Sequence, residues 1–402
     1  MEKTPKFRRA SRIETVTVSD IVIMSEAARA RRAEGHDVIS LGIGEPDFTT
    51  PEHVNQAAIA AINAHDTKYP PIAGKPELRE AVARLYSGRD AANVLISSGS
   101  KYSLLNAFLA TINPGDEVIL PAPFWTSYSD IVRLSGGVPV ILETDAASGF
   151  KPAPDAIEKA ITPRTRWLLL NSPGNPSGSV LTAAEFRAIG EVLEHHPQCW
   201  LMSDEIYEHL TYDMPFVSAH DALPKLQDRC LIINGVSKAY AMTGWRLGFA
   251  IGPEELIRAM TVVQSQGTSG TSTISQAAAL AALTGPQELL STRRDSFRKR
   301  RDLVLGYLRD MDGIETTTPD GAFYVFPSWQ KLRGFRTAEG QPLENDQDFC
   351  RFILNAADTT IIPGSGFASP GHFRISYACS SEDLSTALGR MAAAISTLKA
   401  PR

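Results

Sequence analysis

The stretch LIINGVSKAYAMTGWRLGFAI, residues 231–251, carries the pattern that decides the fold. Two apolar runs, 231–233 and 247–251, are predicted to be strands, and between them lies a loop of small residues with a single lysine, Lys238. Similar apolar runs alternate along the chain with segments of helical spacing, which predicts an α/β domain with a mostly parallel, helix-covered sheet. The other strands expected here are 38–41, 94–97, 117–120, 138–142, 167–170 and 200–203, and the helices are 52–64, 78–86, 102–112 and 183–195.

The residue pattern of the sequence changes near residue 286, and a long charged helix is expected at 288–312. Shorter strands and helices follow, which predicts a smaller α+β domain. We divide the chain into an N-terminal segment that belongs to the small domain (1–44), a large α/β domain (45–285) and a small C-terminal domain (286–402). The strands expected in the last part are 314–317, 322–326, 360–362 and 373–377, and the helices are 346–357 and 382–398.

Composition excludes several classes of protein. The 402 residues are 43% hydrophobic and 21% charged, with a net charge of −5, so neither a nucleic acid nor an anionic membrane is expected as a partner. The four cysteines are scattered without metal-ligand spacing, so we expect no metal site and a reducing, cytoplasmic compartment. The first residues contain no secretory apolar region, and no uncharged run is apolar enough for a membrane span.

Polar residues follow several predicted strands, and parallel strands place such residues at one edge of a sheet, where ligands bind. After strand 94–97, Gly99 and Ser100 open a helix whose free N–H groups suit a phosphate, although Ser100 could be a simple N-cap. After strand 167–170, Asn175 lies in an irregular loop rich in proline and glycine, which could equally be a plain turn.

Two further strand ends carry ionisable groups. Asp204 follows strand 200–203, and Tyr207 lies three residues later; a buried carboxylate there would need a cationic partner, whereas helix capping is the simpler alternative. Lys238 follows strand 231–233. A lysine on a loop is usually solvated, but in a partly desolvated pocket its amine has a lowered pKa and can form a Schiff base with an aldehyde.

These segments together resemble the class I pyridoxal-phosphate aminotransferases, in particular the bacterial beta subgroup of the aspartate aminotransferase family. The resemblance runs from about residue 19 to 391 and includes Gly44-Glu45-Pro46-Asp47-Phe48, Thr67-Lys68-Tyr69, residues 73–79 and Arg374-Ile375-Ser376-Tyr377. It implies the fold type I architecture, with a seven-stranded sheet in the large domain. It also implies pyridoxal phosphate (PLP) as the cofactor.

The resemblance assigns roles at the centre of the site. Lys238 would hold the cofactor as a Schiff base and move the Cα proton, and Asp204 would pair with the pyridine nitrogen and keep it protonated. Tyr207 and Asn175 would donate to the phenolic oxygen of the cofactor. Trp125 would stack on the pyridine face.

The resemblance also assigns the phosphate and substrate contacts. The phosphate would be held by Gly99, Ser100, Lys101, Ser237 and Arg246, and by Tyr69 of a neighbouring subunit, which implies a homodimer with shared active sites. The substrate α-carboxylate would lie between the Arg374 guanidinium and the Gly44 N–H. Lys101 and Ser19 would read a side-chain carboxylate, with Trp125 and Asn175 also lining the substrate position.

The resemblance leaves the substrate open. Ile21 stands where some relatives carry threonine, which weakens strict dicarboxylate specificity, so aspartate is the first expectation and glutamate or aromatic amino donors remain alternatives. The same fold also serves β-lyases and other enzymes that deprotonate Cα. A PLP-binding regulatory domain is a non-enzymatic alternative, but the segment before Gly44 is too short for the DNA-binding module of such regulators.

Overall fold

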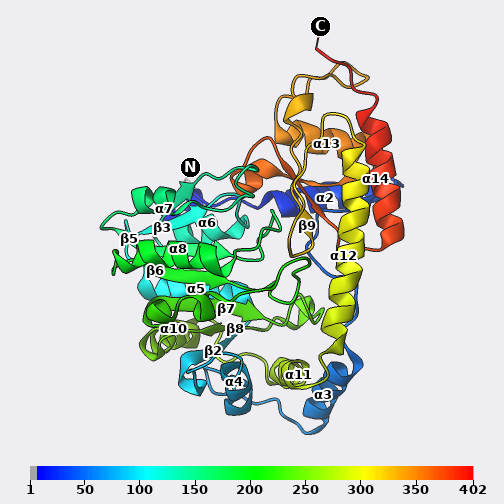
Figure 1. The fold of residues 1–402 in the computed structure, drawn as a ribbon. Coiled ribbons are helices and arrows are strands. Elements are labelled where there is room, and N and C mark those ends of the chain that lie inside the picture. Colours follow the sequence, from blue (N-terminus) through cyan, green and yellow to red (C-terminus); the bar gives the residue numbers. More distant parts are fainter. Residues whose placement is uncertain (1–6, 402) are drawn as a thin grey trace, which may run out of the picture.

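A computed structural model describes residues 7–401, and its centre is the predicted seven-stranded sheet (Figure 1). Adjacent strands are parallel except around β8, which runs antiparallel to both β2 and β7. Apart from the edge strand β4, which is partly exposed, the strands are almost continuously buried because helices cover both faces of the sheet. In spatial order the strands are β2 (Val94–Ser97), β8 (Gly248–Ile251), β7 (Cys230–Gly235), β6 (Trp200–Asp204), β5 (Thr165–Asn171), β3 (Glu117–Pro121) and β4 (Val138–Leu142).

Two hydrophobic clusters hold helices against this sheet. One contains side chains of α8 and α11, and the other contains side chains of α5, α6 and α10. Four of these helices, α3, α4, α5 and α8, were expected from the helical spacing of the sequence. The helices of this part are α3 (Glu52–Asn63), α4 (Pro76–Ala83), α5 (Ser100–Thr111), α6 (Ser127–Leu134), α7 (Pro154–Ala160), α8 (Ala183–Glu194), α9 (Ala219–Ala222), α10 (Glu254–Gly267) and α11 (Thr273–Thr284).

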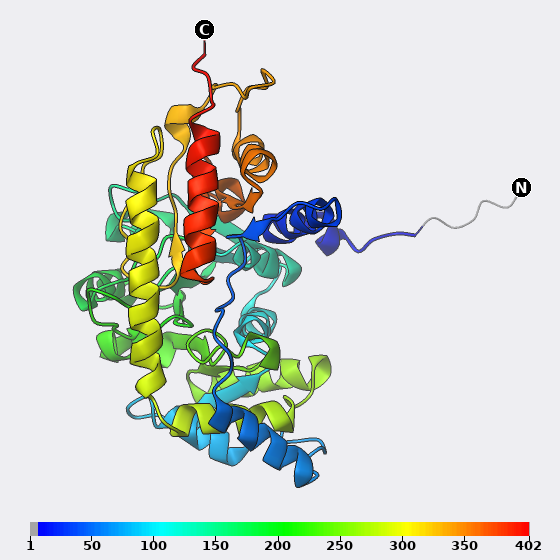
Figure 2. The same ribbon diagram turned by 90° about the vertical axis from the view of Figure 1, so that its right-hand side faces the viewer.

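A third cluster forms a separate core around the long helix α12, which lies beside α14 (Figures 1 and 2). Two small sheets complete this region: a three-stranded antiparallel sheet in the order β11-β12-β9, and the parallel pair β1-β10. The elements are α2 (Asp20–Ala33), β1 (Ile39–Ser40), α12 (Glu288–Arg309), β9 (Tyr324–Val325), α13 (Asp346–Ala357), β10 (Thr359–Thr360), β11 (Ile362–Pro363), β12 (Phe373–Ser376) and α14 (Ser381–Ile395), while the short helix α1 (Ser11–Glu14) contacts α6. Short 3-10 turns lie at 91–93, 224–229, 243–245, 330–332 and 364–367.

Three of the strand predictions need correction. The strand expected at 360–362 is divided between β10 and β11, which belong to different sheets. Residues 38–41 contribute only the short strand β1, which pairs with β10 and stands outside the seven-stranded sheet. The strand expected at 314–317 is wrong, because only Glu315 makes an isolated bridge, to Ser328. Ile314 is nevertheless buried in the third cluster, so its apolar character reflects packing and not strand pairing. The domain boundaries at 44 and 285 stay a prediction.

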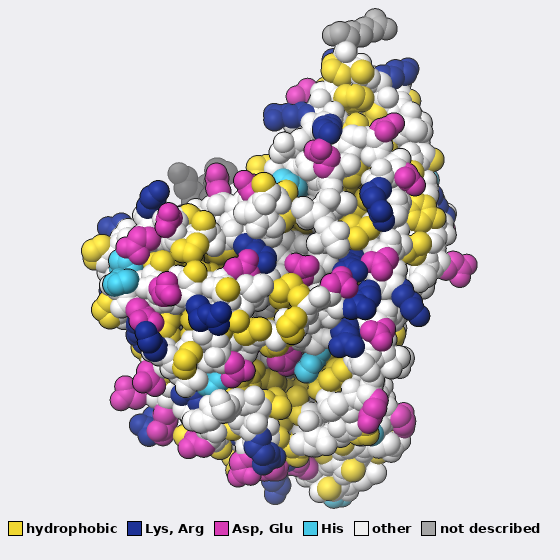
Figure 3. Space-filling model, in the orientation of Figure 1, with side chains coloured by type: hydrophobic (Ala, Val, Ile, Leu, Met, Phe, Trp, Pro, Cys, Tyr) yellow, Lys and Arg dark blue, Asp and Glu magenta, His cyan; other side chains and the backbone are white. Residues whose placement is uncertain are grey.

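The third cluster reaches past the predicted boundary to the segment that follows β6. Ile206, Tyr207, Leu210 and Tyr212 all pack in it, and Tyr212 N–H donates to the Asp320 carbonyl at 2.9 Å. The residues just beyond Asp204 are therefore held by β6 on one side and by the third cluster on the other. No helix within residues 7–401 is long and apolar enough to cross a membrane. On the face drawn in Figure 3, charged side chains of both signs are interspersed.

Candidate active site

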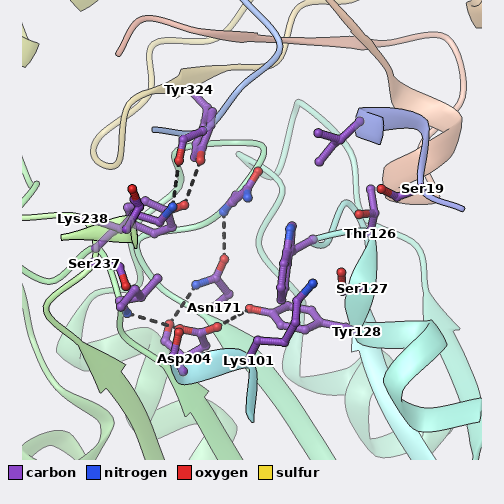
Figure 4. Close-up of a pocket in the computed structure, with 18 of the residues that line it drawn as sticks. Ser19, Lys101, Thr126, Ser127, Tyr128, Asn171, Asp204, Ser237, Lys238 and Tyr324 are labelled. Atoms are coloured by element: carbon purple, nitrogen blue, oxygen red, sulfur yellow. Dashed lines mark hydrogen bonds between the residues drawn. The ribbon is translucent and has the colours of Figure 1, made fainter. Parts of the chain in front are cut away.

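Most of the predicted site residues converge on one cavity of about 360 Å³ between the carboxyl ends of the sheet strands and the α12-centred core (Figure 4). Parallel strands bring their carboxyl ends to one edge, so β2, β5, β6 and β7 each deliver a loop to this place. The cavity lining includes Ser19, Gly44, Ser100, Lys101, Trp125, Asn175, Asp204, Tyr207, Ser237, Lys238, Arg246 and Arg374. Of the predicted residues, Gly99 and Tyr69 are outside this lining.

Asp204, the last residue of β6, is a carboxyl group 4% exposed at the cavity floor. Its Oδ2 accepts a hydrogen bond from the Tyr128 hydroxyl at 2.7 Å, and its Oδ1 accepts one from the Ile206 N–H at 3.2 Å. Burial raises its pKa to about 6, although both hydrogen bonds and the charge of Lys238 oppose that rise. The carboxylate therefore needs a further cationic partner in the cavity to be fully stabilised near neutral pH.

Lys238 follows β7, and its Nζ donates to the Gly44 carbonyl at 2.7 Å. Burial lowers the pKa of this amine to about 8, and the positive charges of Arg374 and Arg246 act in the same direction. About a tenth of the amine is consequently unprotonated and nucleophilic at pH 7, far more than in an exposed lysine.

Tyr207 and Tyr324 bring the two regions together. Their hydroxyl oxygens are 2.8 Å apart, and both rings are buried. Burial raises the pKa of Tyr207 well above its ordinary value, so the phenol stays neutral and can donate its proton.

Arg374 on β12 is a guanidinium buried to 1% exposure without a carboxylate partner among residues 7–401. Its Nη1 donates to Asn175 Oδ1 at 2.9 Å, and its Nη2 donates to the Gly42 carbonyl. Its Nε has no hydrogen-bond partner within the described chain. A buried cation in this state is a receptor for an anionic group, and a carboxylate matches its planar fork.

The helix α5 begins at Ser100 beside the Arg246 side chain. Gly99 has a φ of +91°, and a Cβ there would lie 2.5 Å from Arg246 Nη2, so glycine lets the guanidinium approach the helix start. Arg246 itself is in the left-handed conformation, with φ 53°. Free N–H groups, a hydroxyl and a guanidinium in one corner form an anion cradle.

In the residue after Ser100, the ammonium of Lys101 lies 4.6 Å from the centre of the Trp125 ring. Partial burial, and secondarily the charge of Arg246, lowers the pKa of Lys101. Ser19, at the start of α2, faces the same part of the cavity (Figure 4). Thr126 Oγ1 is buried there and has no partner within residues 7–401.

Tyr69 is 93% exposed and does not reach the cavity of its own chain. Gly44 does line the cavity, but in this structure its carbonyl accepts from Lys238.

The sequence reasoning gave no role to Tyr128, Tyr324 or Thr126, all of which line the cavity. Tyr128 lies three residues after Trp125 on the first turn of α6, and that helical spacing was the available signal. Tyr324 and Thr126 carried no comparable signal in the sequence.

The chain's own residues fit pyridoxal phosphate. The anion cradle at Gly99 suits the phosphate, the buried carboxyl of Asp204 suits a protonated ring nitrogen, and the low-pKa amine of Lys238 suits an aldehyde. The fold and this set of groups define a PLP-dependent enzyme of fold type I.

Comparison with known proteins identifies the family. The family model "Aminotransferase class I and II" matches residues 36–391. The aspartate aminotransferase of Rhizobium meliloti strain 1021 is 49% identical over 402 residues, 98% of each chain. The aspartate/prephenate aminotransferase of Cereibacter sphaeroides is 46% identical over 384 residues, covering 94% of this chain and 96% of that protein.

Solved structures agree with these relatives. A crystal structure of the Rhizobium meliloti aspartate aminotransferase superposes with a TM-score of 0.95 at 49% identity, covering 98% of this chain and 100% of that one. The Thermus thermophilus aspartate aminotransferase with maleate gives a TM-score of 0.89 at 40% identity, covering 97% and 100%. The chain belongs to the class I and II aminotransferase family, in which it is a transaminase, and the lyase and regulator alternatives receive no support from these relatives.

Proposed function

We propose that this enzyme transfers the amino group of L-aspartate to a 2-oxo acid such as 2-oxoglutarate by a ping-pong mechanism. The observation that carries the choice is the pair of cationic groups in one cavity: buried Arg374 on one side and Lys101, held over Trp125, on another. Two cations suit the two carboxylates of a dicarboxylic amino acid. The relatives named above, which carry aspartate in their names, favour the same donor.

The bound cofactor supplies an aldehyde for the amino group and a ring that withdraws electrons from Cα. Lys238 would accept the proton from Cα and deliver it to the carbon of the cofactor that carries the aldehyde, which its lowered pKa allows near neutral pH. Asp204 holds a proton on the ring nitrogen. Tyr207 and Asn175 hold the phenolic oxygen of the cofactor, while Trp125 packs against its ring.

The remaining residues bind and orient the substrate carboxylates and the phosphate of the cofactor. Arg374 binds the α-carboxylate together with the Gly44 N–H, and Lys101 and Ser19 bind the side-chain carboxylate. Ser100, Ser237, Arg246 and the N–H groups of residues 99–101 hold the phosphate.

We further propose a homodimer in which Tyr69 of each chain completes the phosphate site of its partner. A tyrosine with 93% of its surface exposed on a single chain supports this role, because a large aromatic side chain gains stability when another surface covers it. A cytoplasmic location fits the four free thiols, which a reducing compartment maintains.

A half-reaction without acceptor tests the proposal. Addition of aspartate to the PLP-loaded enzyme should release one oxaloacetate per site and change the absorbance of the bound cofactor. Pyruvate and ammonia as products would indicate a lyase, and no reaction with aspartate would contradict the proposed donor. Glutamate, phenylalanine and the amino acid that is formed by amination of prephenate serve as comparison donors, because Ile21 and Val22 add apolar surface to the cavity.

A further inference from the structure

Tyr324 contacts several groups that the proposed function uses, yet it belongs to a different part of the fold. It lies on β9, is 1% exposed and lines the cavity. Its hydroxyl is 2.8 Å from that of Tyr207, and its ring centre is 4.6 Å from the guanidinium carbon of Arg374. A Cβ at Gly44 would lie 2.1 Å from its hydroxyl, so Gly44 packs directly on this phenol.

Counting protons fixes the direction of the bond between the two tyrosines. Each hydroxyl has one proton to donate. If the Tyr207 proton is donated to the cofactor oxygen, the bond between the tyrosines must have Tyr324 as its donor. A hydroxyl that accepts a hydrogen bond becomes a stronger donor itself, because such chains are cooperative.

The ring of Tyr324 contacts Arg374, the second residue that it is inferred to position. The Arg374 guanidinium lies between the Tyr324 ring at 4.6 Å and the Phe367 ring at 5.0 Å, while Asn175 and Gly42 accept from its Nη atoms. A cation over an aromatic face is attracted to it, and contacts with two rings restrict the rotation of the guanidinium. The guanidinium of Arg374 is thus held in one orientation before a carboxylate binds.

We propose that Tyr324 is a positioning residue with two separable roles: its hydroxyl orients and strengthens Tyr207 as a donor, and its ring orients Arg374 for the α-carboxylate. The inference rests on the proposed roles of Tyr207 and Arg374. It links the substrate site on β12 to the cofactor site after β6 through one side chain.

Three variants separate the roles: Tyr324→Phe keeps the ring and removes the hydroxyl, Tyr324→Leu removes both, and Tyr207→Phe removes the donor itself. Tyr377→Phe is the control, because it also loses a buried phenol hydroxyl in the same core but does not line the cavity. The readouts are the pH at which the absorbance of bound PLP changes, and KM and kcat for aspartate.

Loss of a donor to the phenolic oxygen should raise the pH of the spectral transition. We expect a rise in Tyr207→Phe, a smaller rise in Tyr324→Phe, and no rise in Tyr377→Phe. The double variant Tyr207→Phe/Tyr324→Phe should match Tyr207→Phe alone, because the Tyr324 hydroxyl acts through Tyr207. KM for aspartate should stay within about twofold in Tyr324→Phe and rise about 5- to 30-fold in Tyr324→Leu.

A shift in Tyr207→Phe without one in Tyr324→Phe, or shifts that add in the double variant, would overturn the hydroxyl role and leave the proposed function intact. An unshifted Tyr207→Phe would overturn the role of Tyr207 as well. Equal KM values in the Phe and Leu variants would overturn the ring role. Should Tyr324→Leu not fold, Tyr324→Met in its place keeps bulk without an aromatic face.

Discussion

The Tyr128 hydroxyl donates to Asp204 Oδ2 at 2.7 Å, in the interior of the molecule. Tyr128 is 1% exposed, and Trp125 packs edge-on against its ring at 5.5 Å. Trp125, which is proposed to pack on the cofactor, therefore also holds the Tyr128 phenol that stabilises the Asp204 carboxylate. Asp204 receives its charge-stabilising contact from α6, outside its own strand.

Tyr128→Phe should raise the pKa of Asp204 above its value of about 6, because the lost hydrogen bond favours the ionised carboxylate. In the cofactor-free protein the loss of unfolding free energy should reach about 1–3 kcal/mol at pH 8 and be smaller at pH 5, where the carboxyl is protonated. Denaturant titrations at both pH values measure this. Tyr240→Phe, which removes a buried hydroxyl bonded to Gln287, should show no such pH dependence. Equal losses at the two pH values would contradict the assignment.

Lys238→Ala should lose the covalent attachment of PLP and at least about a hundredfold in transamination rate, since a general base contributes two to four orders of magnitude. Borohydride reduction followed by peptide mass spectrometry should find the adduct at Lys238 in the native enzyme. Lys225→Ala, a surface change beside Glu194, should behave as the native enzyme. An adduct at another lysine would refute the mechanism.

The lowered pKa of Lys238 also predicts a pH-dependent stability. Its folded value of about 8 lies below the ordinary 10.5, so between these values the unfolded chain binds more protons than the folded one. The contribution of this lysine to the unfolding free energy should therefore rise with pH across that window, by up to about 3 kcal/mol. The difference in unfolding free energy between the cofactor-free native protein and Lys238→Ala, measured from pH 7 to 10.5, checks the sign. A flat difference would show that the amine titrates normally.

Arg374→Lys should keep the charge and lose the planar fork that Asn175 and Tyr324 hold in place. We expect KM for aspartate to rise about 10- to 100-fold, because hydrogen bonds to charged groups are worth about 1.5–3 kcal/mol. Steady-state kinetics with separate kcat and KM provide the test, and Arg351→Lys on the exposed side of α13 is the control. An unchanged KM would remove Arg374 from the substrate site.

Mixed dimers test the proposed sharing of sites. Chains with Lys238→Ala and chains with Tyr69→Ala should each form homodimers of low activity. A hybrid has one site with both native residues if Tyr69 serves the partner, so mixing after mild unfolding should restore activity toward half of the native value per hybrid. Activity no higher than the average of the two homodimers would place Tyr69 outside the partner's site.

Local patterns predicted much of the fold. The strands 94–97 and 138–142 and the helix 346–357 have the bounds that the structure gives them, because a β-branched strand or an amphipathic helix carries its signal in its own residues. The strand expected at 314–317 failed because burial of Ile314 produces the same apolar pattern without a pairing partner. Periodicity also could not show that residues 38–41 pair with β10, about 320 positions away.

The sequence by itself determined which strand ends carry Asn175, Asp204 and Lys238, since residue type and position after a strand are local properties that parallel topology gathers at one edge. Only the tertiary structure decided that Tyr128, 76 positions before Asp204, holds its carboxylate, and that Tyr324, 117 positions after Tyr207, meets its hydroxyl. Those contacts depend on how α6 packs on the sheet and how the α12-centred core meets the segment after β6. Packing between distant elements leaves no trace in local spacing, because many sequences bury a tyrosine without giving its hydroxyl the same partner.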